Sequence, residues 1–137
     1  MSNNCPCGSR KSYQECCGPY HDGKIAEDAL TLMKARYAAY ACYRPEYIIQ
    51  TTHLKSPQYQ IDKVLWAKEI EQFSKNTVFE GLKIVDYLPG ETRSTVHFIA
   101  CLKQGDRDVS FKEESIFEKV HGRWFYLSGK TQSVPRF

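Results

Sequence analysis

Thr95-Val96-His97-Phe98-Ile99-Ala100-Cys101-Leu102 is the clearest strand signal in this 137-residue chain. Every second residue from Val96 to Leu102 is apolar, which is the period of a strand that buries one face. Further extended stretches cover 77–87, 108–120 and 123–127, and a short turn signal containing glycine separates each from the next. Consecutive strands joined by short turns pair antiparallel, so the second half of the chain predicts a four-stranded antiparallel meander. In its first strand, Leu82 and Ile84 are expected on one face and Val85 and Tyr87 on the other.

The first half of the chain carries the period of helices instead. Apolar residues recur every three or four positions from Ala26 to Tyr40 and predict an amphipathic helix over 25–43, which Pro45 ends. Further helices are predicted over 45–51 and 61–75. Helices followed by an antiparallel sheet define an α+β fold, in which about three helices cover one face of the sheet.

The composition is that of one globular domain with a small appendage. Hydrophobic residues make up 42% of the chain and charged residues 26%, which excludes disordered and fibrous classes. The longest apolar run, from Tyr37 to Tyr43, is far shorter than the ~20 residues that a bilayer span needs. The first residues lack the basic and apolar segments of a secretory signal, so a cytoplasmic location and no membrane partner are expected.

The charge pattern gives little reason to expect a polyanionic partner. The formal net charge is +3, from 19 basic and 16 acidic side chains, and no basic tract exceeds two residues. No nucleic-acid-binding module is recognisable, so specific nucleic-acid binding is not expected. Weak association with RNA or the ribosome through Arg10, Lys11 and Lys24 stays open, and it would show as strong salt dependence.

Four of the six cysteines lie within thirteen residues, at Cys5, Cys7, Cys16 and Cys17. In a reducing compartment such a local cluster is more typical of metal binding than of disulfides. Four thiolates complete the tetrahedral shell of a zinc ion, and a complete shell is typical of structural rather than catalytic zinc. We therefore predict one structural zinc ion per chain.

The residues between the cysteines fit this hypothesis. Pro6 restricts the backbone, Gly8 allows a turn, and the segment between Cys7 and Cys16 is long enough for a turn and a short helix that presents the second cysteine pair. His21 could replace Cys17 as the fourth ligand, although a surface or packing role fits it better. The two isolated residues, Cys42 and Cys101, lie in apolar patterns and are expected to be buried and unreactive.

The string CPCGSRKSYQECCG, at residues 5–18, resembles the SEC-C motif, a zinc-binding element of the bacterial preprotein translocase motor. The resemblance implies that Cys5, Cys7, Cys16 and Cys17 are the zinc ligands. In the motor the motif binds a secretory chaperone and the ribosome. The resemblance therefore implies contact with a protein partner.

The stretches at 29–40 and 122–126 resemble the YchJ family of small bacterial proteins. That resemblance implies a SEC-C zinc knuckle over residues 1–22, followed by a nuclear-transport-factor-2-like (NTF2-like, or cystatin-like) domain over 23–137. The family has no established biochemical role, so the resemblance supplies a fold and a metal but no reaction.

Candidate polar residues in the main domain are Asp86, His97, Glu113 and Glu114. A histidine and a carboxylate on neighbouring strands could perform acid–base chemistry, but charged strand residues usually face solvent or pair with nearby lysines. Arg36, amid apolar helix residues, is expected to pair with a carboxylate or to lay its stem over the edge of the core.

Two functions from different classes follow. The first is a non-catalytic adaptor, in which the zinc knuckle presents a surface to a protein partner. The alternative is small-molecule binding or catalysis in a cavity of the α+β domain, since folds of this kind often enclose one. A deep cavity with His97 and a carboxylate pointing inward favours the alternative, and a cavity plugged by Phe, Tyr and Trp side chains favours the adaptor. No residue is assigned as catalytic.

Overall fold

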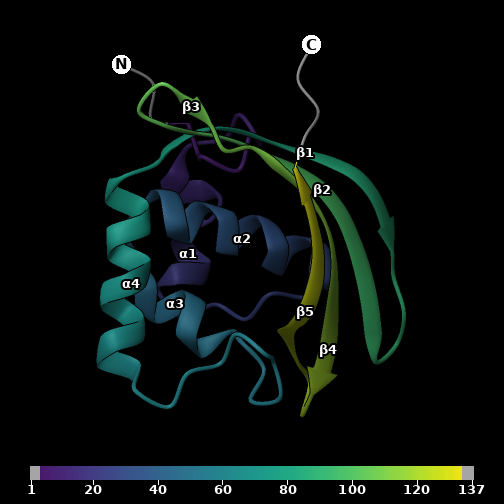
Figure 1. Ribbon diagram of the computed structural model, residues 1–137. Helices are drawn as coiled ribbons and strands as arrows, with labels where there is room; N and C mark the ends of the chain where they lie inside the picture. The colour runs from purple at the N-terminus through teal and green to yellow at the C-terminus, as the bar shows by residue number, and fades with distance from the viewer. Residues whose placement is uncertain (1–3, 134–137) are drawn as a thin grey trace.

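A computed structural model describes residues 4–133, in which helices cover one face of a curved antiparallel sheet (Figure 1). The sheet order is β1 (Val78–Leu88), β2 (Arg93–Gln104), β4 (Phe111–Val120) and β5 (Arg123–Ser133), each antiparallel to the next. A two-residue strand, β3 (Arg107–Asp108), pairs with the end of β2. The predicted α+β fold and four-stranded meander are confirmed.

Strand β2 is an inner strand of the sheet, and one of its faces forms part of the core. Val96, Phe98, Ala100 and Leu102 are at most 5% exposed, whereas the residues between them are half-buried. The alternation in sequence therefore becomes a buried face toward the helices and an outer face toward solvent.

The prediction that Tyr87 lies on the opposite face from Leu82 and Ile84 is wrong. The register with β2 shifts between Ile84 and Asp86, which is a β-bulge. One extra residue returns Tyr87 to the inner face, where it packs against the core together with Leu82 and Ile84, while Val85 stays exposed.

The predicted strand at 108–120 is interrupted near its start. The Val109 N–H donates to the Leu102 carbonyl, and the Leu102 N–H donates to the Ser110 hydroxyl. The Ser110 side chain thus replaces a backbone partner, and the chain divides into β3 and β4. Strand β5 continues past the predicted end at residue 127, pairing with β4 as far as Ser133.

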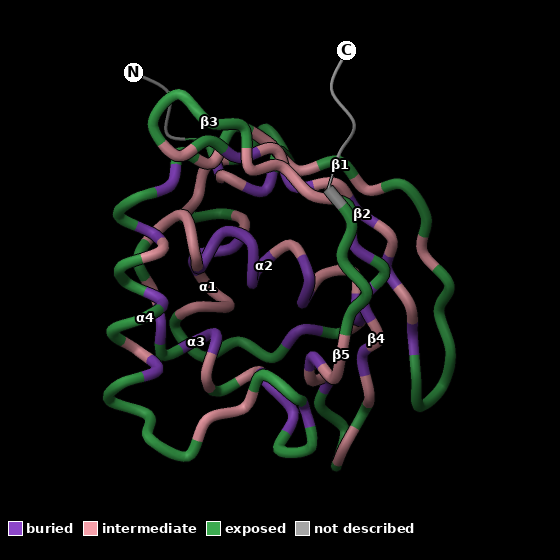
Figure 2. Tube along the Cα trace, in the orientation of Figure 1, coloured by how far each residue is buried: buried purple, intermediate pink, exposed green. Residues whose placement is uncertain are grey.

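Three helices of the main domain occur where they are predicted: α2 (Ala29–Ala41), α3 (Pro45–Gln50) and α4 (Lys63–Lys75). Helix α2 begins later than residue 25, because the Asp28 carboxylate caps it by accepting from the Thr31 N–H at 2.7 Å. Asp62 caps α4 through Leu65 in the same way. Helix α2 is buried along most of its length, between the sheet and the other helices (Figure 2). Within residues 4–133, no helix is long and apolar enough to cross a membrane.

The N-terminal knuckle, residues 4–22, packs against the main domain. It contains a 3₁₀ turn, η1 (Tyr13–Glu15), and a short helix, α1 (Gly18–His21). The His21 ring lies 2.8 Å from the Ala35 carbonyl of α2, and Arg44 forms an ion pair with Asp22 at 2.9 Å. The division into domains at residue 22 stays a prediction.

Candidate metal centre and internal cavity

The four clustered cysteines converge on one point. The sulfur atoms of Cys5, Cys7, Cys16 and Cys17 all lie within 4.8 Å of one another. Cys16 Sγ lies 3.6 Å from Cys7 Sγ and 3.9 Å from Cys17 Sγ. A tetrahedron with metal–sulfur distances of about 2.3 Å has edges of about 3.8 Å, whereas a disulfide would need about 2.05 Å. The arrangement therefore fits four separate ligands around one metal ion.

Local hydrogen bonds bring the two cysteine pairs together. The Gly8 N–H donates to the Cys5 carbonyl, and Gly8 has a φ of 88°, which turns the chain back sharply. The Cys5 N–H donates to the Lys11 carbonyl, closing the loop after the first pair. The 3₁₀ turn then presents Cys16 and Cys17, as the sequence predicts for a short helix at this place.

The thiols of the cluster differ in how firmly they hold their protons, because hydrogen bonds between them shift their pKa values in opposite directions. The pKa of Cys7 is lowered because hydrogen bonds from the Cys17 and Cys5 thiols stabilise its thiolate. The pKa of Cys17 is raised by its hydrogen bonds to Cys5 and Cys7, with burial adding to the effect. One sulfur therefore carries negative charge most readily, and a cation must displace the remaining thiol protons.

His21 is not part of the cluster. Its Nδ1 lies 2.5 Å from the Tyr13 hydroxyl and its Nε2 lies 2.8 Å from the Ala35 carbonyl. Both ring nitrogens are thus engaged by groups other than a metal, and burial lowers the pKa of the ring. His21 has the packing role that its sequence context favours, joining the knuckle to α2.

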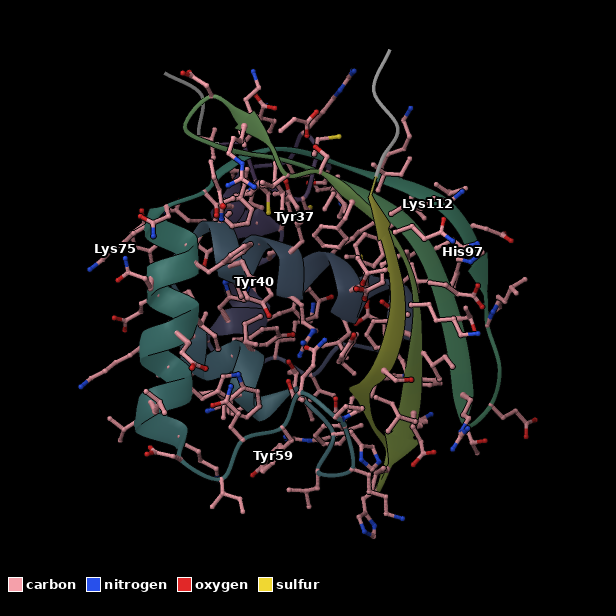
Figure 3. All side chains as sticks on the ribbon, viewed as in Figure 1. Tyr37, Tyr40, Tyr59, Lys75, His97 and Lys112 are labelled. Carbon is pink, nitrogen blue, oxygen red and sulfur yellow. The ribbon has the colours of Figure 1, made fainter. Side chains whose placement is uncertain are left out.

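A cavity of about 500 Å³ lies between the helices and the inner face of the sheet. Figure 3 looks toward this region, with Tyr37 and Tyr40 of α2 on the side of the sheet that faces the helices. Much of the wall is aromatic, including Trp66, Phe73, Phe98, Phe111 and Phe117. The aromatic residues thus line the cavity without filling it.

Two buried charged residues, Glu113 and Arg36, also line the cavity. Glu113 accepts hydrogen bonds from the hydroxyls of Ser115, Tyr126 and Thr131. The expectation that Glu113 is solvated or paired with a lysine is wrong, because the strand alternation turns it inward. The sequence signal for this was the period of β4, in which Glu113 shares the face of Ser115 and Phe117.

Arg36 pairs with neutral oxygens instead of the carboxylate considered from the sequence. Its Nη1 donates to Thr51 Oγ1 at 2.8 Å, Thr52 Oγ1 at 3.1 Å and the Ile48 carbonyl at 3.2 Å. Its Cζ lies 4.7 Å from the ring centroid of Tyr126. Arg36 thereby ties α2 to the end of α3.

The other candidate polar residues lie outside the cavity. His97 Nε2 and Glu114 Oε2 are 2.7 Å apart on neighbouring strands. His97 lies on the outer face of the sheet (Figure 3), and Glu114, which pairs with it in register, is exposed. The pKa of Glu114 is lowered by that hydrogen bond. Asp86 is exposed on β1. Cys42 and Cys101 are half-buried, and neither belongs to the sulfur cluster.

Comparisons with known proteins agree with this architecture. The SEC-C motif matches residues 1–19, and the YchJ middle NTF2-like domain matches residues 28–129. A solution structure of a SEC-C motif containing protein from Rhodopseudomonas palustris is 32% identical, with a TM-score of 0.77 over 96% of this chain and 99% of that one. A crystal structure of such a protein from Psychrobacter arcticus is 30% identical, with a TM-score of 0.74 over 97% and 85% of the two chains.

The fold and the sulfur cluster thus define a SEC-C motif protein with an NTF2-like domain. A UPF0225 protein from Actinobacillus succinogenes is 35% identical over 135 residues, covering 96% of this chain and 84% of the relative. The chain belongs to the YchJ family.

Proposed function

We propose that the four cysteines hold one structural zinc ion per chain, and that this centre shapes a surface by which the chain acts as a cytoplasmic protein-interaction adaptor. Tetrahedral sets of four thiolates are typical of zinc sites or of iron–sulfur sites. Zinc has no redox chemistry, so a zinc site can be purely structural. All four positions would be filled by protein sulfur, so the ion would have no free position for a substrate. This donor set supports a structural role.

The ion would fasten the knuckle onto the main domain. Cys5, Cys7 and Cys17 are buried and Cys16 is half-buried, so most of the cluster is covered by the surrounding chain. The backbone at Gly8 also approaches β1, where an added Cβ would lie 3.8 Å from the Leu82 carbonyl. Ordering of so short a segment is coupled to metal binding, because it has little core of its own.

The observation that carries the adaptor proposal is the exposed loop at residues 8–11. The Ser9 hydroxyl donates to Cys16 Sγ at 3.1 Å and accepts from the Lys11 N–H at 3.2 Å. Arg10 has a φ of 69°, in the left-handed region that non-glycine residues rarely adopt. The loop is therefore held in one conformation that projects Arg10 and Lys11 into solvent.

This surface suits an acidic protein partner. Two adjacent basic side chains on a fixed loop would attract acidic groups and orient the encounter. The SEC-C motif of the translocase motor binds a chaperone and the ribosome, and we extend the analogy only to the class of partner, a protein. Specific nucleic-acid or membrane binding forms no part of the proposal.

Elemental analysis and affinity purification test the two halves of the proposal separately. Carefully reduced native protein should contain one zinc per chain, and Cys16→Ser protein much less. Absorption of the cobalt-substituted protein should show four-sulfur ligation and not three sulfurs with one nitrogen. Absence of bound metal in the native protein would overturn the zinc half.

The adaptor half is tested by reversing the charge of the loop. A double variant, Arg10→Glu with Lys11→Glu, should lose the partners that native protein retains from the source cell, while its zinc content is unchanged. Lys130→Glu, an exposed lysine on β5, is the matched control and should retain them. Equal partner sets for all three proteins would remove the adaptor function and leave the metal centre intact.

A further inference from the structure

The internal cavity has one open polar edge, on the guanidinium of Arg36. All three hydrogen bonds of this group come from Nη1, so Nε and Nη2 donate to none of the described residues. Among residues 4–133, the sealed side-chain nitrogens and oxygens that lack a partner are Arg44 Nε and Ser74 Oγ. The two remaining nitrogens of Arg36 are not sealed in this way, and Arg36 lines the cavity.

The Nε–Nη2 edge has the shape that recognises a carboxylate. Its two N–H groups point in parallel, so that each can bond one carboxylate oxygen. Arg36 is only 6% exposed, and no described Asp or Glu forms an ion pair with it. Burial lowers the pKa of Arg36, yet an arginine stays protonated in proteins. A buried cation whose edge lacks an anion is a specific binding element.

Glu113 does not occupy this role. Its charge is covered by the three hydroxyl donors, and the Tyr126 hydroxyl among them lies 3.3 Å away. The ring of Tyr126 stacks on Arg36, so the aromatic residue joins the two charged groups without bringing them into contact. Arg36 therefore keeps an open edge although a carboxylate lines the same cavity.

The rest of the cavity is suited to an apolar body. Trp66 and Phe73 come from α4, and Phe98 and Phe111 come from the sheet. A volume of about 500 Å³ lies within the range of small-molecule sites. At the rim, half-buried Gln60 and exposed Glu69 are joined by a hydrogen bond of 2.8 Å.

We propose that this cavity binds a small monocarboxylate with an aromatic or aliphatic body, its carboxylate held by the Nε–Nη2 edge of Arg36 and its apolar part enclosed by Trp66, Phe73 and Phe98. The site is separate from the metal centre, and it serves binding whether or not the knuckle recruits a protein.

Three probes of similar size separate the chemistry: phenylacetate, phenylacetamide and phenethylamine. The chain has two tryptophans, of which Trp66 lines the cavity and Trp124 does not. In NMR titrations of the full metal-loaded chain, phenylacetate should shift the indole resonance of Trp66 and leave that of Trp124 nearly unchanged. Because a charge-assisted pair is lost, phenylacetamide should bind about tenfold more weakly, and phenethylamine more weakly still. No shift with phenylacetate, or tighter binding of the amine, overturns the proposal.

Two variants test whether phenylacetate binds in the cavity. Arg36→Lys keeps the positive charge but loses the two parallel N–H donors of the guanidinium, and it should weaken phenylacetate binding about tenfold. Because Arg36 also supports α3, Ala100→Leu gives a second test: it adds bulk to the cavity wall and should weaken all three probes. Glu114→Gln, on the outer face, is the control. A folded Ala100→Leu protein that binds phenylacetate as native protein does would show that the ligand lies elsewhere, and so would native affinity in Arg36→Lys.

Discussion

The cysteine cluster and the internal cavity both place polar atoms in apolar surroundings, but they satisfy those atoms in different ways. In the cluster, sulfurs from one short segment face one another, with neighbouring pairs 3.6 and 3.9 Å apart. In the cavity, the polar groups come from separate elements, and Arg36 keeps one edge open. The first arrangement can be completed by an ion alone and suits a structural role. The second needs a shaped ligand and suits recognition.

The largest effect is expected from Cys16→Ser. Loss of one of four ligands should reduce the metal content from one ion per chain to near zero, because the remaining site is incomplete. Residues 4–22 should then lose their order while the α+β domain stays folded. Amide NMR spectra with elemental analysis on the same samples measure both effects.

Cys101→Ser is the matched control, since Cys101 is a half-buried thiol outside the cluster. It should leave metal content and the signals of the knuckle unchanged. An ordered knuckle in metal-free Cys16→Ser protein would show that packing alone holds residues 4–22, and that the ion is dispensable for order.

The next largest effect is expected on the free energy of unfolding, where two adjacent glutamates, Glu113 and Glu114, should differ. Glu113→Ala leaves the hydroxyls of Ser115, Tyr126 and Thr131 without their acceptor, and it should lower the free energy of unfolding by about 2–4 kcal/mol. Glu114→Ala, on the outer face, should change it little. Denaturant unfolding of the two variants side by side measures the difference. Equal destabilisation by both would mean that Glu113 is not held as described.

The sequence was sufficient for whatever depended on local pattern. The alternation from Val96 to Leu102 predicted the central strand and its buried face, and the four sulfurs lay close enough along the chain to suggest one centre. Both signals are contained in a few consecutive residues. The bulge between Ile84 and Asp86 was not predictable in this way, because it depends on the register with β2.

The partners of the polar groups in the cavity could not be predicted from local sequence pattern. Lys112-Glu113-Glu114 resembles a solvated charge run, and the burial of Glu113 depends on hydroxyls from Tyr126 and Thr131 on the following strand. The open edge of Arg36 likewise depends on α3 supplying oxygens to one nitrogen only. The period of β4 is consistent with an inward-facing Glu113, but the partners of both side chains come from distant segments, which the pattern of one strand or helix does not reveal.

The two sites should also differ in their response to pH. The raised pKa of the Cys17 thiol means that its proton is held more firmly, so a cation binds more weakly as the pH falls. Apparent metal affinity should fall by about tenfold per pH unit for each proton displaced, measured by competition with a chelator. Phenylacetate binding at Arg36 should stay constant from about pH 6 to 9, because both partners remain charged. Parallel pH profiles for the two sites would contradict the comparison.

The smallest effect on metal retention is expected at Arg10, because the backbone of this exposed residue lies in the strained left-handed region. A residue other than glycine in the left-handed region has a conformational free energy of roughly 1 kcal/mol above that of glycine, and Arg10→Gly removes this cost. Glycine also increases the conformational entropy of the knuckle when it is not folded, which partly offsets the gain. Since ordering of the knuckle is coupled to metal binding, this variant should hold its metal about two- to fivefold more tightly in chelator competition. Lys11→Gly is the control: Lys11 does not have a positive φ, so glycine there should only weaken retention. If both glycine variants weaken retention equally, the left-handed conformation of Arg10 carries no conformational cost.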